Sequence, residues 1–210
     1  MSDAVHTSSP NTLSEDIAFV RALAEEGRNR PWRGGVSLAA GLIWGTASLY
    51  SWSVVIKAWA SPFGPDSAGW VWLVASLVFA VVGFPLGIYR GRPDTNRTAA
   101  AAWGAVGVAI WAVSAAIVIA AVRAHTPAMF ALLPPMCMAI YGGAWFMSSV
   151  AYKTGWQRWV GGLSVLTSLV LAYVASQPVE LLLFALALYG LAGLPGLIAV
   201  LGAPKSANRA

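Results

Sequence analysis

Six apolar stretches alternate with short polar segments along most of the chain. The first, residues 36–59, reads VSLAAGLIWGTASLYSWSVVIKAW and contains one charged residue, Lys57, near its end. A helix of about 20 residues crosses a hydrocarbon core that is roughly 30 Å thick. The pattern therefore predicts an all-α membrane protein, with a bundle of six transmembrane helices over residues 36–201. The other predicted spans are residues 70–89, 99–122, 129–151, 159–175 and 179–201.

The segment before the first span has an amphipathic pattern instead. Thr12 and Glu15 match a capping box, and Gly27 suits the position just past a helix end. We expect a disordered tail over residues 1–11, and a cytoplasmic amphipathic helix with a basic linker over residues 12–35. This helix packs beneath the bundle or on the lipid headgroups, or it docks a cytosolic partner. Its candidate partner-docking face consists of Leu13, Ile17, Val20 and Leu23.

The basic residues between the predicted spans are distributed unevenly. Eleven of the 13 Lys and Arg residues fall on one side of the predicted membrane, and only Lys57 and Arg123 fall on the other. Because basic residues resist translocation, this split places both termini in the cytoplasm, including a tail over residues 202–210. The eleven are Arg21, Arg28, Arg30, Arg33, Arg90, Arg92, Arg97, Lys153, Arg158, Lys205 and Arg209. The short loops and compact plan indicate a bacterial cytoplasmic (inner) membrane.

The composition excludes several classes of protein. The chain is 58% hydrophobic and 10% charged, whereas ordinary soluble domains contain about 25% charged residues. The net charge of +5 would suit nucleic acid, but the basic residues are scattered over short connections. Topology and contact with anionic headgroups explain that distribution better, so the expected partner is the lipid bilayer and not nucleic acid. A single cysteine, Cys137, excludes an intrachain disulfide.

Three sets of residues are candidates for specific contacts. Ser37, Gly41 and Gly45 recur every fourth residue, so they form a helix-packing face where another backbone can come close. Lys57 and Glu180 have opposite charges and a similar predicted depth at the outer surface. They are candidates for an ion pair at the rim, or for a cation or proton entry site. The candidate headgroup contacts in one inner loop are Arg90, Arg92 and Arg97.

The sequence contains no arrangement that is typical of an enzyme or a cofactor site. The middle portions of spans two to five hold no Asp, Glu, Lys, Arg or His, and intramembrane ionisable residues are the usual mark of function. Haem would require histidines inside the spans, but His6 and His125 lie outside them. Met136, Cys137 and Met138 are soft copper ligands that fan around a helix instead of converging. We therefore expect no catalytic residue, metal or cofactor, and no enzymatic activity.

Two functions remain as alternatives. The first is a non-enzymatic accessory or regulatory membrane subunit that docks a membrane or cytosolic partner, or a second copy, through the amphipathic helix or a small-residue face. The second is a small transporter or channel for a weakly polar solute. Its path would pass near Trp111, Trp145 and the predicted kinks at Pro85 and Pro195. The lack of buried polar groups and the glycine-rich faces of spans one, three and six favour the first.

Overall fold

The computed structural model describes residues 15, 17–19, 34–58, 61, 63–64, 67–90 and 97–202, the side chains of 83–90 and 97–98 excepted. Within these residues the secondary structure is helical, as predicted, and contains no strand. The helices are α2 (Gly35–Val55), α3 (Ser67–Arg90), α4 (Arg97–Ala124), α5 (Leu133–Tyr152), α6 (Gly155–Tyr173), α7 (Pro178–Leu188) and α8 (Leu194–Leu201). A 3₁₀ helix, η1 (Pro127–Leu132), precedes α5, and a π-helical turn, η2 (Tyr189–Gly193), joins α7 to α8.

Prolines mark the starts of several helices. Pro127 begins η1, Pro134 and Pro135 stand in the first turn of α5, and Pro178 begins α7. Proline is tolerated at these positions because a first-turn N–H has no partner within its own helix. The hydroxyl of Ser168 in α6 donates a hydrogen bond to the carbonyl of Pro135 (2.8 Å). The start of α5 is therefore tied to its neighbour α6.

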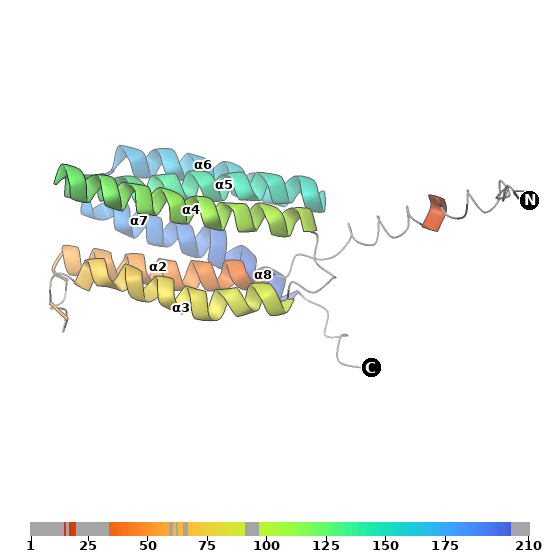
Figure 1. Ribbon diagram of the computed structural model, residues 1–210, viewed down its shortest axis with the longest axis horizontal. Coiled ribbons are helices and arrows are strands. Elements are labelled where there is room, and N and C mark those ends of the chain that lie inside the picture. Colours follow the sequence, from red (N-terminus) through yellow and green to blue (C-terminus); the bar gives the residue numbers. More distant parts are fainter. Residues whose placement is uncertain are drawn as a thin grey trace, which may run out of the picture.

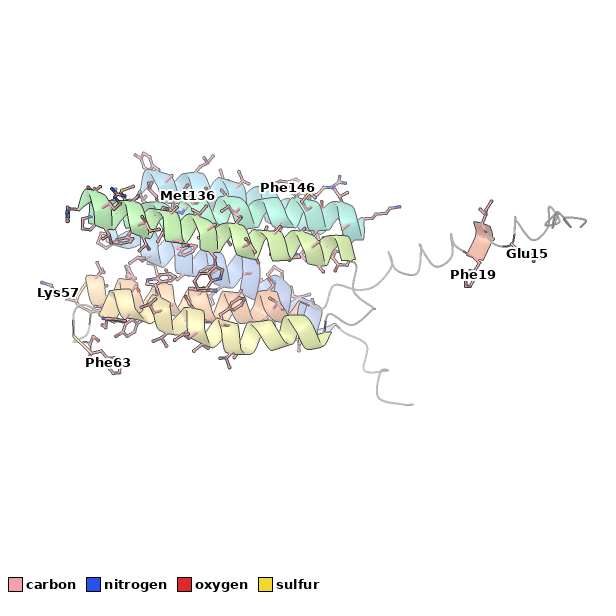
Figure 2. The ribbon with its side chains drawn as sticks, viewed as in Figure 1. Glu15, Phe19, Lys57, Phe63, Met136 and Phe146 are labelled. Carbon is pink, nitrogen blue, oxygen red and sulfur yellow. The ribbon has the colours of Figure 1, made fainter. Side chains whose placement is uncertain are left out.

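Successive helices run antiparallel as an up-and-down bundle (Figure 1). One layer contains α4, α5 and α6, and the other contains α2 packed against α3. The last rod, α7–η2–α8, packs mainly along α2 and also touches α5 and α6, so it joins the two layers. One end of the bundle carries Lys57, at the end of α2 (Figure 2). The other end carries the α5–α6 connection with Lys153, and we call it the Lys153 end.

Four helices of the described chain are long and apolar enough to cross a membrane. They are Gly35–Val55, Ala99–Ala124, Pro127–Tyr152 and Pro178–Leu201. The described part of α3 counts as a shorter apolar helix, Ser67–Val82, and α6 is not among the four. The chain therefore has the helices of a membrane protein. The count of six spans and the side of each terminus belong to the proposal below.

The bundle has a narrow interior and an apolar outer surface. Within the described residues, one buried cluster contains Met138, Leu171, Phe184, Ala187 and Leu188, and a second contains Tyr141, Trp145 and Ala192. Large apolar side chains also point outward: Met136 and Phe146 on α5 are 43% and 42% exposed (Figure 2). Such exposure suits lipid, because acyl chains are as apolar as these side chains.

Candidate functional site

The predicted helix-packing face of α2 lies against the last rod of the same chain. Ser37, Gly41 and Gly45 are all buried. A Cβ added at Gly41 would collide with the backbone of Gly193 in η2, and a Cβ added at Gly196 would collide with the backbone of α2. The two backbones meet this closely only because neither side carries a side chain. This face is therefore covered by η2 and α8 and is not open to another protein.

Hydroxyl groups of α2 bind carbonyls of the last rod. Ser37 Oγ donates to the Ala192 carbonyl (2.9 Å) and lies 3.0 Å from the hydroxyl of Tyr141 in α5. Since the Ser37 proton is engaged by the carbonyl, the Tyr141 hydroxyl donates in the second bond. One further hydroxyl, that of Ser48, donates to the Leu181 carbonyl (2.7 Å). Ala192 belongs to the π-helical turn η2, which interrupts the regular α-helical hydrogen bonding of the last rod. Ser37 therefore binds the last rod at the point where the backbone hydrogen bonding of that rod is irregular.

Aromatic rings fill the region where α4, α5 and α6 meet. The ring of Trp103 lies 5.3 Å from the rings of both Tyr141 and Trp145, in edge-on geometry, and Trp145 lies 5.4 Å from Trp156. Trp145 is fully buried, whereas Trp111 is 57% exposed on α4. The structure does not bring Trp111 and Trp145 together around one path. Spacing within a single helix could not reveal this cluster, because its rings come from three helices.

Lys57 and Glu180 differ in their surroundings. Lys57 is exposed beyond the end of α2, and the described residues include no ion pair between the two. The Glu180 side chain is buried, and its Oε2 accepts the backbone N–H of Ser176 (2.9 Å). Glu180 is the third residue of α7 after the N-cap Gln177, which is the position from which an acidic side chain reaches back to cap a helix. The role that the structure gives Glu180 is to cap α7.

Helix α4 is the least covered of the four candidate spans. Only 11% of its most apolar part is buried, against 33% in each of the other three. Its buried residues, Ala99, Ile117 and Ala121, lie on the side that packs on α5. The opposite side is exposed and mixes small residues with large apolar ones, which are Val108, Trp111, Val118, Ile119 and Val122. We call this surface the α4 small-residue face, and its members are Ala101, Gly104, Ala105, Ala112 and Ala115.

The other predicted contacts lie partly beyond the described chain. Arg90 ends α3 and Arg97 begins α4, but only their backbone is described, and Arg92 lies outside the described residues. Ile17 is helical and 59% exposed. The rest of the candidate docking face, Leu13, Val20 and Leu23, lies outside the described residues.

The methionine and cysteine string of α5 points in several directions. Met136 is 43% exposed, Met138 is 1% exposed, and Cys137 is intermediate. The three sulfur atoms therefore do not share one environment. In the described part of the chain, no three His, Cys, Asp or Glu side chains come together in a group suited to a metal ion.

Comparisons with protein-family models, with curated proteins and with solved structures found no match. A function must therefore be argued from the geometry. Within the described residues, two surfaces are left uncovered: the α4 small-residue face, and an open hollow at the α5–α6 connection.

Proposed function

We propose that the protein is a non-enzymatic accessory or regulatory subunit of a membrane complex, which packs a transmembrane helix of a partner against the α4 small-residue face. The observation that carries this proposal is the combination of low burial and small residues on α4. A Cβ added at Gly104 or at Gly107 would meet nothing within 4 Å. The backbone of α4 is therefore accessible to another helix.

Helix association in lipid favours such a surface. Water does not drive helices together there, so close van der Waals packing between backbones contributes most, and Gly and Ala allow it. A surface that only faces lipid gains nothing from small side chains. Both peripheral helices expose large apolar side chains, such as Leu77 on α3 and Ile119 on α4, but the exposed Gly and Ala residues are concentrated on α4. The two peripheral helices thus differ in their exposed small residues, which favour α4 as the docking surface.

The proposal includes six spans with both termini in the cytoplasm of a bacterial cell. The antiparallel order of the rods supports this count, because α3 and α6 lie alongside the four candidate spans. The excess of basic residues in connections at the Lys153 end supports the orientation. Reporter fusions after residues 33, 64 and 210 test it: cytoplasmic activity is expected at the first and last positions only.

Packing around Trp145 favours a subunit over a transporter. A solute path near this residue would need space between helices, but the rings of Trp103, Tyr141 and Trp156 surround it at 5.3–6.0 Å. The hydroxyls of Ser37 and Ser48 on α2 likewise donate their hydrogen bonds to carbonyls of the last rod. Neither arrangement provides a continuous polar lining for a solute.

Photocrosslinking in native membranes tests the docking surface. A benzophenone amino acid replaces Trp111, which borders the α4 small-residue face and is 57% exposed. The matched control replaces Trp70, which is 64% exposed on α3. We expect a protein adduct from position 111 and none from position 70. An adduct at twice the chain mass would identify a second copy, and a different mass would identify another protein. Absence of a protein adduct from position 111 would contradict the proposal.

A further inference from the structure

An exposed aromatic side chain stands between α2 and α3, at the end of the bundle that carries Lys57, which we call the Lys57 end. It belongs to Phe63, which is 80% exposed and points away from the helices (Figure 2). A side chain this exposed contacts whatever surrounds the protein at its depth. The hydrogen bonds around Phe63 determine that depth.

Three hydroxyl groups hold the turn that carries Phe63. The Tyr50 hydroxyl of α2 donates to Ser67 Oγ (3.0 Å) and lies 2.7 Å from Ser61 Oγ. The two serine hydroxyls also bond each other (2.8 Å), and that of Ser67 donates to the Gly64 carbonyl (2.6 Å). The backbone N–H of Phe63 itself donates to Ser61 Oγ (3.2 Å). Phe63 is therefore held outward by a hydrogen-bonded turn, which we call the hydroxyl turn.

The hydroxyl turn lies alongside the last turn of α2 and not beyond it. Ser51 Oγ donates to the Ala68 carbonyl (3.0 Å), so the second residue of α3 is level with a residue four positions before the end of α2. At 1.5 Å per residue, α2 extends about 6 Å past this level. The side chain of Tyr50 starts one residue earlier and leans towards the start of its helix. Ser61, which it binds, is therefore no nearer the surface, and Phe63 is tied to Ser61.

The protein surface around this depth is apolar. Val55 and Ile56, which lie further along α2, are 46% and 42% exposed, and Trp70 in the first turn of α3 is 64% exposed. The exposed charge of Lys57 follows directly. Such a change from apolar to charged residues beside an exposed indole is typical of the boundary between hydrocarbon and headgroups. Phe63 lies on the apolar side of this boundary, and its ring has no polar group that would favour the other side.

We propose that Phe63 inserts into the lipid leaflet at the Lys57 end and anchors the start of α3 there. A docking site for a soluble protein surrounds its aromatic anchor with polar groups that bind the partner. The hydroxyls of Tyr50, Ser61 and Ser67 bond one another instead, and lipid requires no polar contact from the turn. Interfacial anchors of this kind set the depth and tilt of a transmembrane helix. The inference depends neither on the α4 small-residue face nor on which leaflet is cytoplasmic.

Thiol labelling and fluorescence quenching test the anchor in phosphatidylcholine liposomes that contain only this protein. Phe63→Cys is made in a full chain that carries Cys137→Ser. The matched controls in the same chain are Lys57→Cys, which is exposed beyond α2, and Leu77→Cys, which is 69% exposed on the side of α3. A membrane-impermeant maleimide should label position 63 about tenfold more slowly than position 57, because the reactive thiolate is disfavoured away from water.

A polarity-sensitive dye on each thiol measures the surroundings directly. Nitroxide groups on the lipid acyl chains should quench the dye at position 63, as they quench it at position 77, whereas iodide in the water should quench mainly the dye at position 57. If position 63 is labelled and quenched as position 57 is, the proposal is overturned, and the ring faces water where a soluble protein could bind it. Thermal unfolding verifies that each variant is folded.

Tyr50→Phe tests whether the hydroxyl turn holds the anchor, because it keeps the ring and removes only the hydroxyl. Added to Phe63→Cys, it should raise the rate of maleimide labelling at position 63 about threefold, since the turn loses two of its hydrogen bonds. The matched control is Ser76→Ala, whose hydroxyl bonds the Trp72 carbonyl within its own helix (2.7 Å), and it should leave the rate unchanged. Equal rates in the two variants would overturn the role of the hydroxyl turn.

Discussion

Helices α2 and α4 carry the same kind of sequence signal and have different surroundings. Both present small residues at helical spacing, Ser37, Gly41 and Gly45 on α2 and Gly104 and Ala112 among others on α4. On α2 these residues are buried against η2 and α8, whereas on α4 they are exposed. A small-residue face thus indicates that a backbone will come close, but not which backbone it is. The face of α2 packs against the last rod, and the face of α4 is not covered by the described part of the chain.

The largest expected effect is on the covered face. Gly41→Leu places a side chain where the backbone of Gly193 lies. That backbone can move little, because it is held by the hydrogen bonds of its own helix. We expect a loss of about 3 kcal/mol in the free energy of unfolding, with the last rod displaced from α2. Thermal unfolding in detergent measures the loss. If Gly41→Leu were as stable as the wild type, the conclusion that the α2 face is covered while the α4 face is open would be wrong.

The same change on the open face should affect association and not folding. Gly104→Leu extends into space where an added Cβ meets nothing within 4 Å, so the free energy of unfolding should change by less than about 0.5 kcal/mol. Binding of the partner should weaken at least about tenfold, because the bulk keeps the helices apart. The mass of the complex extracted in mild detergent measures this. Leu77→Phe on α3 is the control, and it should leave the complex intact.

A smaller effect distinguishes the hydroxyls along α2. Ser37→Ala leaves the Ala192 carbonyl and the Tyr141 hydroxyl without their partner and should cost about 1 kcal/mol of unfolding free energy. Thr46 is exposed, and among the described residues its hydroxyl forms a hydrogen bond with that of Tyr189 (2.9 Å). Thr46→Val should therefore cost less than about 0.5 kcal/mol. Equal losses in the two variants would show that the buried hydrogen bonds of Ser37 add no stability beyond that of the glycine contact.

Sequence reasoning located the helices because their signal is local. A segment in lipid forms a helix because it is costly to expose backbone polar groups there. The continuous apolar stretch that marks such a helix can be recognised without knowing which helices pack beside it. The start of α7 at Pro178 and its contact with Glu180 also involve residues close in sequence, but sequence reasoning predicted Glu180 only as a candidate for an ion pair or an entry site. Lys57 and Glu180 illustrate the limit: similar depth and opposite charge made them candidates for a pair, but depth alone cannot place two side chains next to each other, and the described residues include no ion pair between them.

The sequence by itself determined that the chain is helical and apolar, because these properties follow from residues within one turn or one span, but it predicted helix ends that differ by up to four residues, as at Val55 and Gly155. Only the tertiary structure decided which faces are covered. It placed Gly41 against Gly193, gathered Trp103, Tyr141 and Trp145 from two helices into one cluster, and left the α4 small-residue face open. The physical reason is that small apolar residues pack almost equally well against any close backbone. The choice among neighbours therefore depends on how all the rods fit together.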